Sequence, residues 1–383
     1  MNGERKSTSY RDLREQNRLS WNAVVGAHDS HRGDLAGFLR GGCNTLFPEE
    51  RSLLGDLNGK MLAHLQCNSG GDSLSLALLG ASVTGVDISD EAISSARHLS
   101  SKSGIPADFV RADVYDWLAV TAQEGPRFDV VYGSYGVVCW LPDLRAWAEG
   151  IASVLRPGGR FVIVDFHPTA MMFDELWNHA HAYYSGGEPL AKDNGVGDYV
   201  AEAGGRLTPA GFVEGVRDFD NPQRCHLFRW GLGEVVTSVA GAGLRVTVLQ
   251  EYPYSNGERH FAEMRELPGR RMVPPESVPS VPLMYGIRAC KGGALRREKE
   301  GKHRDDIDTT EHSPFKPARF SIEGDKGGNH DRRAQGDELQ GVKARSRGWP
   351  RRGPRKTRIG VTRRATCSEE LKETAIEKSM LFL

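Results

Sequence analysis

The sequence has no run of about 20 apolar residues, the length that a membrane-spanning helix requires. Cysteine is scarce as well, with six in 383 residues and no C-x-x-C pair or zinc-like spacing. Scattered cysteines of this kind favour free thiols in a reducing compartment over a disulfide framework. The N-terminal residues are polar and lack the apolar core of a secretory signal. We therefore expect a cytoplasmic protein without a membrane span, a disulfide framework or a bound metal.

Net charge is also lacking, because 50 basic residues balance 50 acidic ones, but the two signs are unevenly distributed. Residues 292–383 carry an excess of about seven positive charges, which leaves the rest of the chain negative by about the same amount. Aliphatic runs vanish there, and the segment Lys343–Arg364 has ten basic residues and no acidic one. This composition predicts a basic, disordered tail over 292–383, with a short helix near Ser368–Ser379.

Short apolar runs alternate with helical patterns before that tail. The helical patterns include 90–104, where Ser89 is a candidate cap, and the amphipathic segment 142–159. Continuous apolar strands that alternate with helices predict an α/β fold with a doubly wound, mostly parallel, Rossmann-like sheet of about seven strands. The runs that predict strands are 61–67, 82–89, 107–113, 128–134, 160–166, the end of 233–253, and 281–290.

Ligands bind outside the carboxyl ends of the strands in such a sheet. Asp87 ends the second predicted strand, where an acid can accept hydrogen bonds from ribose hydroxyls. The phosphate-binding pattern G-x-G-x-x-G is absent, since the first turn reads QCNSGG with its only glycines at 70 and 71. These two features favour a nucleoside cofactor without a diphosphate, of which S-adenosylmethionine (SAM) is the obvious candidate.

Several motifs in order carry a more specific resemblance. They are HLQCNSGGDSLSLALLGASVTGVDISDEAISSAR, ADFVRADVYD, FDVVYGSYGVVCWLPDL and LRPGGRFVIVDFHP, together with NRLSWN near the N-terminus and GEVVTSVAGAGLRVTVLQEYPY. Together they resemble a class I SAM-dependent methyltransferase, and more narrowly a bacterial-type subfamily whose first loop reads L-Q-C. The resemblance covers roughly residues 10–291. It implies an N-terminal helical lid over 1–59, a methyltransferase domain over 60–291 and an inserted substrate region over 168–230.

The resemblance also implies roles for single residues. Gly70 keeps the glycine that lets the backbone approach the amino-acid end of SAM, Asp87 binds the ribose hydroxyls, and Asp113 with Val114 holds the adenine. For both aspartates the alternative is a helix cap. The complete set of cofactor-binding residues that we expect is Gln66, Cys67, Asn68, Gly70, Asp87, Ile88, Asp113, Val114, Gly133, Ser134, Asn22 and His28. Trp21 is expected either in the lid or as a core anchor of the first helix.

Methyl transfer requires mainly that the acceptor be positioned in line with the sulfonium. A general base is needed only where the attacking atom is protonated at working pH. His167, directly after the fifth predicted strand, and Tyr135, after the fourth, are the candidate catalytic residues, and a structural role for His167 before Pro168 is the alternative. The aromatic and histidine side chains of 168–230 are expected to pack the insertion, while the segment caps the acceptor.

The function expected from the resemblance is methyl transfer from SAM to a small-molecule acceptor. A nucleic-acid methyltransferase that uses the basic tail is one alternative, although the segment after the fourth strand reads GSYG and the body is acidic. A nicotinamide oxidoreductase and a non-catalytic scaffold of the same fold are the others. The acceptor, the methylated atom and the oligomeric state do not follow from the sequence.

Overall fold

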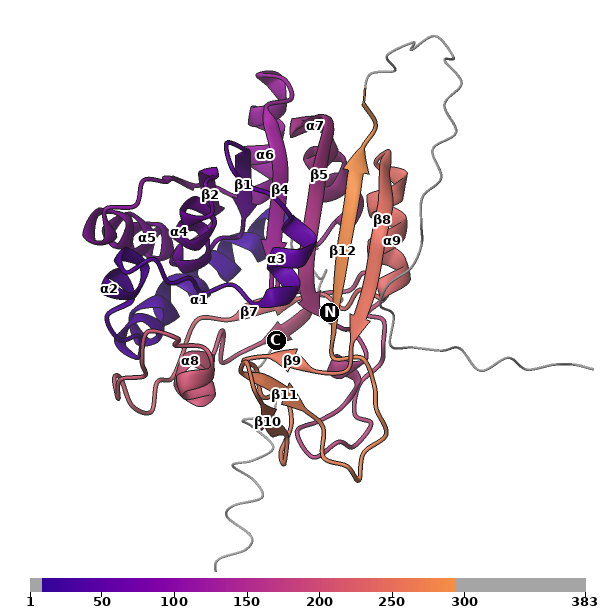
Figure 1. Cartoon of the computed structure of the whole chain (residues 1–383). Helices are drawn as coiled ribbons and strands as arrows, with labels where there is room; N and C mark the ends of the chain where they lie inside the picture. The colour runs from indigo at the N-terminus through magenta and orange to yellow at the C-terminus, as the bar shows by residue number, and fades with distance from the viewer. Residues whose placement is uncertain (1–8, 294–383) are drawn as a thin grey trace, which may run out of the picture. The chain divides into compact units, whose positions relative to one another are not determined.

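A computed structural model describes residues 9–293, and seven strands of this part form one sheet (Figure 1). Their order is β3-β2-β1-β4-β5-β12-β8. The strands are β1 (Met61–Leu65), β2 (Ser82–Asp87), β3 (Asp108–Arg111), β4 (Phe128–Ser134), β5 (Leu155–Phe166), β8 (Leu244–Tyr252) and β12 (Met284–Lys291). Strands β1 to β5 pair in parallel, and β12 runs antiparallel to both of its neighbours. The predicted α/β fold with a mostly parallel seven-stranded sheet is confirmed.

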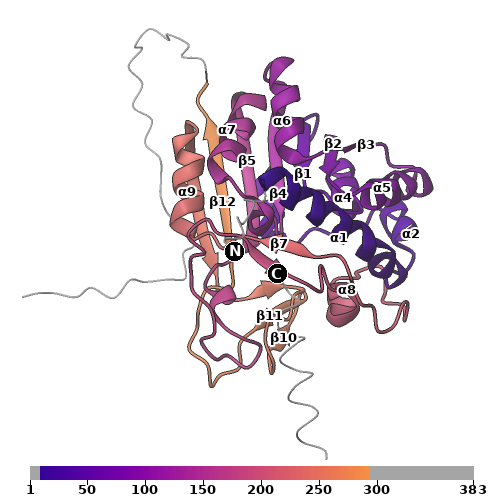
Figure 2. The same cartoon turned by 180° about the vertical axis from the view of Figure 1, so that it is seen from behind.

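Helices cover both faces of this sheet. Those that flank it or precede it are α1 (Tyr10–Ser30), α2 (Leu35–Arg40), α3 (Pro48–Leu54), α4 (Gly71–Leu78), α5 (Asp90–Ser103), α6 (Val114–Gln123), α7 (Leu144–Val154) and α9 (Leu232–Gly241). Helices α6, α7 and α9 pack on one face, which is turned toward the viewer in Figure 2. Helices α3 and α4 pack on the other face.

Alternation along the central strands explains this division. Ala63 and Phe161 belong to the core under α6, α7 and α9, whereas their neighbours Leu62 and Val162 belong to the core under α3 and α4. Successive side chains of a strand point to opposite faces, so a continuous apolar run is what a sheet covered on both sides requires.

Local sequence signals set the ends of several helices. Ser89 caps α5 by accepting the Ala92 N–H, and Gly104 ends that helix in the left-handed conformation with φ 73°. Asp143 caps α7, which ends at Val154, so the Pro-Gly-Gly segment that follows belongs to β5 and not to the helix. Helix α6 was not predicted from the sequence, although its cap Asp113 was singled out for another role.

Two insertions add small sheets beside the main one. The predicted insertion 168–230 contains β6 (Leu190–Lys192), α8 (Tyr199–Ala203) and β7 (Cys225–Leu227). A second insertion, between β8 and β12, was not predicted, and it forms the three-stranded sheet of β9 (Ser255–Asn256), β10 (Arg265–Leu267) and β11 (Arg271–Val273).

Some sequence-based predictions concern residues beyond this range. The expected disordered tail from 294 onward and the short helix near Ser368–Ser379 lie outside the described residues. Within residues 9–293, no helix has the length and apolar character needed to cross a membrane. The same range holds no cluster of three or more histidine, cysteine, aspartate or glutamate side chains suited to a metal ion.

Candidate active site

A cavity of about 320 Å³ opens at the carboxyl ends of β1, β2 and β4. This is the edge of the sheet where a ligand is expected in an open α/β fold. Its lining comes from four parts of the chain: the N-terminal helices, the strand-end turns, the insertion 168–230 and the insertion 253–283. Of the predicted cofactor residues, the cavity brings together Gln66, Cys67, Asn68, Gly70, Asp87, Ile88, Asp113, Val114 and Ser134.

The turn after β1 adopts three left-handed residues without three glycines. Gln66, Asn68 and Gly70 have φ values of 54°, 50° and 78°. Asn tolerates this conformation best among residues with a side chain, and the Asn68 Oδ1 accepts the Ser69 N–H at 2.6 Å. The turn is closed by the Gly70 N–H, which donates to the Cys67 carbonyl at 3.1 Å. The sequence QCNSGG therefore makes a tight turn even though its first two left-handed positions are not glycine.

Gly70 is required at its position for two separate reasons. Its positive φ disfavours a side chain, and a Cβ there would lie 2.7 Å from the Ala96 Cβ and 2.8 Å from the Phe109 ring. Cys67 is packed equally tightly, because a Cβ on the neighbouring strand residue Gly85 would lie 2.9 Å from its sulfur. Burial raises the pKa of the Cys67 thiol well above its usual value. Cys67 is thus a small buried side chain and not a thiolate nucleophile.

Asp87 joins the ends of β1 and β2. One carboxylate oxygen accepts the Asn68 N–H at 2.8 Å and the other accepts the Ser89 N–H at 2.9 Å. Burial raises the pKa of Asp87, and these backbone hydrogen bonds oppose that effect. The N-cap of α5 is Ser89, so the alternative interpretation of Asp87 as the helix cap does not hold. The Ile88 N–H also lowers the pKa of Asp87 by hydrogen bonding. Because a carboxylate can accept about four hydrogen bonds, Asp87 retains acceptor capacity for a ligand.

Asp113 has the capping role that was its alternative. It caps α6, and its Oδ1 accepts the N–H groups of Tyr115 and Asp116 at 2.9 and 3.4 Å. Its Oδ2 contacts the Arg14 Nε of α1 at 3.0 Å. Burial raises the pKa of Asp113, and Arg14 opposes that effect. Asp113 and the adjacent Val114 still line the cavity, so capping does not remove them from the site.

Three predicted cofactor residues do not line this cavity. Gly133 lies within β4, one residue before the cavity-lining Ser134. Asn22 is occupied between α1 and α5, where it donates to Asp90 at 3.0 Å and accepts from the Ser89 hydroxyl at 2.7 Å. These positions contradict direct contact of Gly133 or Asn22 with a ligand in the cavity.

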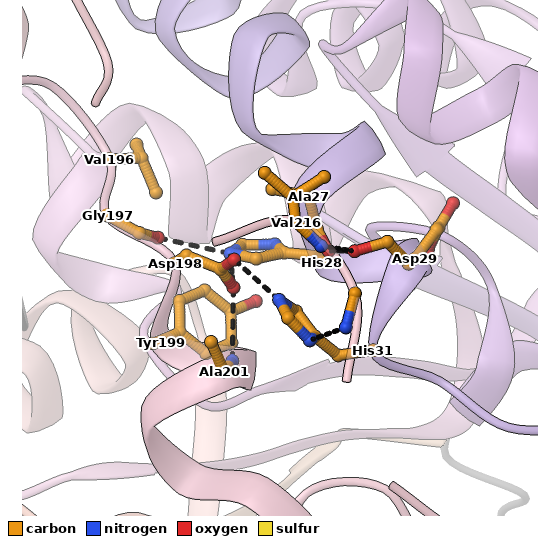
Figure 3. A network of polar contacts seen from close by, with 12 residues as sticks. Ala27, His28, Asp29, His31, Val196, Gly197, Asp198, Tyr199, Ala201 and Val216 are labelled. Carbon is orange, nitrogen blue, oxygen red and sulfur yellow. Dashed lines mark hydrogen bonds and ion pairs between the residues drawn. The ribbon is translucent and has the colours of Figure 1, made fainter. Parts of the chain in front are cut away.

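His28, the third, is buried in a polar network between α1 and α8 (Figure 3). Its Nε2 lies 3.1 Å from the Gly197 carbonyl, and its ring packs 4.2 Å from that of Tyr199. Burial lowers the pKa of His28 to about 3. Asp198 also contacts the His31 Nε2 at 2.9 Å. The network therefore holds insertion 168–230 on α1 and places Tyr199, which does line the cavity.

The position predicted for His167 is wrong. Phe166 at the end of β5 lines the cavity, and the next side chain points elsewhere because strand residues alternate. The His167 Nδ1 accepts the Thr169 N–H at 3.0 Å, and its Nε2 lies 2.8 Å from the Glu251 carboxylate on β8. Burial lowers the pKa of His167, and Glu251 opposes that effect. The alternative, a structural histidine, describes these contacts.

Tyr135, the other candidate catalytic residue, does line the cavity. Its backbone is left-handed, with φ 42°, and its hydroxyl donates to Glu50 at 3.2 Å. The Asn256 amide donates to the same hydroxyl at 2.9 Å. Burial raises the pKa of Tyr135 well above its usual value, so its hydroxyl is neutral at physiological pH.

Sequence reasoning missed several polar residues of the cavity. Glu50 comes from α3, and Asn256 and Glu258 come from the second insertion. Burial raises the pKa of both carboxyls, Glu50 and Glu258, to about 8. A charged residue in a sequence reads as a surface residue, and no local motif distinguishes these two. The missed signal was the length of the segment between β8 and β12, which is too long for a simple hairpin.

Insertion 168–230 contributes to the cavity through residues other than its most conspicuous ones. Val196, Tyr199, Val200 and the run 207–210 line it. Phe173 and Trp177 instead pack with Phe261 in a separate cluster, as the packing interpretation expects. Trp21 lines the cavity, and its ring packs 5.4 Å from that of Trp140. Its role in a lid stays a prediction.

The ionisable lining has more acids than bases, but its charges balance at neutral pH. Five carboxyls border the cavity, at Glu50, Asp72, Asp87, Asp113 and Glu258, together with the three arginines Arg14, Arg32 and Arg270. His64 adds no charge at neutral pH, since burial lowers its pKa to about 4. A pKa of about 8 leaves Glu50 and Glu258 largely protonated at neutral pH, so three carboxylates are matched by the three arginines. Such a lining suits a polar ligand with both hydrogen-bond donors and acceptors.

Part of this site lies in a segment that is similar to known proteins. Residues 63–159 match a family model described as a methyltransferase domain. A ubiquinone biosynthesis O-methyltransferase of Xanthomonas euvesicatoria pv. vesicatoria is 31% identical over 118 residues, which are 31% of this chain and 48% of that protein. The protein of that name from Paramagnetospirillum magneticum is 34% identical over 126 residues, 32% of this chain and 47% of that protein. The chain thus spans about half the length of these curated relatives.

Solved structures were compared as well. An S-adenosylmethionine dependent methyltransferase from Mesorhizobium loti has 17% identity and a TM-score of 0.40, with 64% of this chain and 96% of that one covered. The matched residues 63–159 run from β1 into β5 and include the turn 66–70, Asp87 and Asp113. The match of residues 63–159 to a methyltransferase domain confirms the predicted resemblance over this segment.

Proposed function

We propose that this chain transfers a methyl group from SAM to a small-molecule acceptor held in the cavity. One observation carries the proposal: the Gly70 turn and the Asp87 carboxylate meet at the mouth of β1 and β2, within the matched segment. The curated relatives act on ubiquinone precursors by name, and the acceptor of this chain is proposed only as a small molecule.

The residues of the cavity fit SAM on three grounds. Asp87 keeps acceptor capacity for the ribose hydroxyls. The turn 66–70 brings backbone close to the cavity without a side chain at Gly70, and the buried Gln66 Oε1 has no hydrogen-bond partner in the described part of the chain. A ligand ammonium group would satisfy such an acceptor. Ile88 and Val114 offer apolar surface for the adenine. Asp113 Oδ2, which contacts Arg14, can also accept from the adenine amine.

SAM supplies an activated methyl group on a sulfonium, so the chain's own task is to position and desolvate the reactants. The aromatic side chains of Trp21, Trp140 and Tyr199 form one wall of the cavity. We propose residues 60–291 as the catalytic domain, with 168–230 as its substrate region. The N-terminal segment 1–59 would act as the lid, since Arg14, Asn17 and Trp21 on α1 line the cavity.

Calorimetry on the full chain tests the proposal. SAM and S-adenosylhomocysteine should bind with NADH giving no heat, because the turn lacks a pyrophosphate cradle. Binding of NADH without binding of SAM would replace methyl transfer by a nicotinamide reaction. Binding of SAM without any transfer of label to a broad mixture of small acceptors would leave a non-catalytic scaffold.

A further inference from the structure

Two neighbouring carboxyls of α3, Glu49 and Glu50, are buried in opposite electrostatic surroundings. Glu49 is ion-paired with Arg271, and it accepts hydrogen bonds from the Tyr254 hydroxyl at 2.8 Å and the Asn256 amide at 3.1 Å. Burial alone would raise the pKa of Glu49, but these contacts outweigh it and hold the pKa below its usual value. Glu49 is therefore a charged anchor for the second insertion.

Glu50 has no cation among its hydrogen-bond partners in the described chain. It accepts from the hydroxyls of Tyr132 and Tyr135 and from the Phe47 N–H at 2.7 Å. Its side chain is only 1% exposed. Burial, and then the charge of Asp72, raise its pKa to about 8. Two adjacent carboxyls whose pKa values are pushed apart are a recurrent sign of acid–base chemistry.

Tyr135 connects Glu50 to the cavity. Its hydroxyl donates its proton to the Glu50 Oε2 and accepts one from Asn256. Tyr135 lines the cavity, where a hydroxyl group of the acceptor would donate to the Tyr135 oxygen in place of Asn256. The left-handed backbone of Tyr135, at φ 42°, is a strained conformation of a kind that persists where function requires it.

We propose that Tyr135 and Glu50 form a proton relay that removes the proton from a hydroxyl group of the methyl acceptor. The inference rests on the proposed function and names its substrate class, an alcohol or phenol. As the acceptor oxygen bonds to the methyl carbon, the carbon–sulfur bond breaks and its electron pair stays on sulfur. The acceptor's proton passes to the Tyr135 Oη while the Tyr135 proton passes to the Glu50 Oε2. One positive charge, the sulfonium, and one negative charge, the Glu50 carboxylate, disappear together.

A hydroxyl acceptor is the class that needs such a relay. Alcohols and most phenols remain protonated at neutral pH and are weak nucleophiles, whereas thiols ionise readily and neutral amines attack through a lone pair. The titratable groups that face Glu50 are Tyr132 from β4, Tyr135 directly after β4, Asp72 from α4 and Arg270 from the second insertion. None of them supplies a hydrogen-bonded cation that would hold Glu50 permanently ionised.

A pair of matched probes, 2-naphthol and 2-naphthalenethiol, tests the relay with methyl-labelled SAM and the full chain. The thiol needs no base because it is ionised at pH 8. Glu50→Gln should slow naphthol methylation about 100- to 10,000-fold, the usual contribution of a general base, and should change thiol methylation less than about threefold. Tyr135→Phe should act in the same direction. Tyr254→Phe is the control, since it removes the hydroxyl that contacts Glu49 instead and lies outside the cavity.

The pH profile adds a second readout. A base with its pKa near 8 must be ionised to act, so naphthol methylation by the wild-type chain should rise up to about pH 8 and then level off. In Glu50→Gln the plateau above pH 8 should vanish, because the remaining rate should keep rising with the ionised fraction of the naphthol itself. Thermal melts and SAM affinity must first show that each variant folds and binds.

Three results would overturn the relay. The first is naphthol methylation that survives in both Glu50→Gln and Tyr135→Phe. A second is an equal loss with both probes, which would mean that Glu50 only holds the cavity together. The third is a wild-type chain that binds SAM but leaves naphthol unmethylated, whatever it does with the thiol. Failure of SAM to bind the wild-type chain is a different result, because it refutes the proposed function itself.

Discussion

The cavity has two walls that are built in different ways. The strand-end wall consists of residues 66–70, 87–88 and 113–114. Its contacts join neighbouring strand ends, such as the hydrogen bond from the Asn68 N–H to the Asp87 carboxylate. The assembled wall consists of Glu50, Tyr135, Tyr199, Asn256 and Glu258. Its contacts join side chains far apart in sequence: 85 positions separate Tyr135 from Glu50, and 207 separate Asn256 from Glu49.

This difference teaches which part of a site is fixed by the fold and which is free to vary. Any chain that makes this sheet brings the ends of β1 and β2 together, because adjacent parallel strands end at the same edge. The assembled wall depends on two insertions and on α3, none of which the sheet requires. We therefore expect substitutions in the first wall to affect the cofactor and those in the second to affect the acceptor.

The largest effect should come from Asp87→Ala in the strand-end wall. A carboxylate that accepts from two ribose hydroxyls makes charge-assisted contacts of about 1.5–3 kcal/mol each. The substitution should therefore weaken SAM binding by roughly 10- to 1,000-fold in calorimetry. Asp116→Ala is the matched control, because Asp116 is exposed and pairs only with Arg11 at 3.6 Å. It should leave the affinity unchanged.

Folding has to be checked in the same variant. Asp87→Ala also leaves the buried N–H groups of Asn68 and Ser89 without their acceptor, which costs stability. Asp87→Asn keeps one acceptor oxygen and separates the two effects. Unchanged SAM affinity in a folded Asp87→Ala chain would limit Asp87 to a structural role. The strand-end wall would then have no special effect on cofactor binding.

The next effect concerns stability in the strand-end wall. Gly70→Ala combines an unfavourable φ of 78° with a Cβ placed 2.7–2.8 Å from Ala96 and Phe109, so it should lower the free energy of unfolding by about 2–4 kcal/mol. Gly125→Ala is the control, since Gly125 has φ 85° but no atom within 4 Å of the added Cβ. It should cost only about 1 kcal/mol. Urea denaturation measures both, and equal losses would mean that packing against Phe109 contributes nothing.

Both the fold and the strand-end wall could be predicted from the sequence because each depends on local patterns. Short continuous apolar runs predicted the strands, and Asp87 lies directly at the end of one of them. The sequence left open whether Asp87 and Asp113 are helix caps. Ser89, not Asp87, caps α5, whereas Asp113 does cap α6. The L-Q-C subfamily remains a prediction.

The assembled wall could not be predicted because nothing local marks it. Glu50 follows another glutamate in the first turn of a helix, where acids are ordinary. Its burial arises only when α3 packs on β4, against Tyr132 and Tyr135. Asn256 and Glu258 lie in a segment whose short strands have no clear period. The prediction for His167 had a related weakness. His167 does follow the fifth strand of the sheet, but the sequence does not show toward which face its side chain points.

A smaller effect should appear in the pH dependence of stability, through Glu258 in the assembled wall. Burial, and then Glu202, raise its pKa to about 8, above the usual value of about 4.5. Between these two pH values the folded chain holds a proton that the unfolded chain has lost, so this group makes stability fall as pH rises from about 5 to 8. Below about pH 4 Glu258 is protonated in both the folded and the unfolded chain, so it no longer changes the stability with pH.

Glu258→Gln removes this titration. The variant should equal the wild type in stability near pH 4 and exceed it by about 1–3 kcal/mol at pH 8, measured by urea denaturation across that range. Glu263→Gln, at another position of the same insertion, is the control and should follow the wild-type curve. A Glu258→Gln chain that is less stable than the wild type at pH 8 would mean that Glu258 is ionised in the folded state.

The smallest effect should come from His167→Gln, which tests the boundary of the assembled wall. His167 contacts Glu251, whose side chain is 51% exposed, and a pair of this kind contributes at most about 1 kcal/mol. The Thr169 N–H also loses its acceptor at the Nδ1, so the free energy of unfolding should fall by about 1 kcal/mol.

SAM affinity and the rate of methyl transfer should stay within about threefold of wild type, because Phe166, not His167, lines the cavity. Phe166→Ala, one residue earlier, is the positive control and should weaken acceptor binding. If His167→Gln instead slowed transfer 100-fold in a folded chain, the histidine would belong to the site after all, and the alternation of side chains at the end of β5 would be broken there.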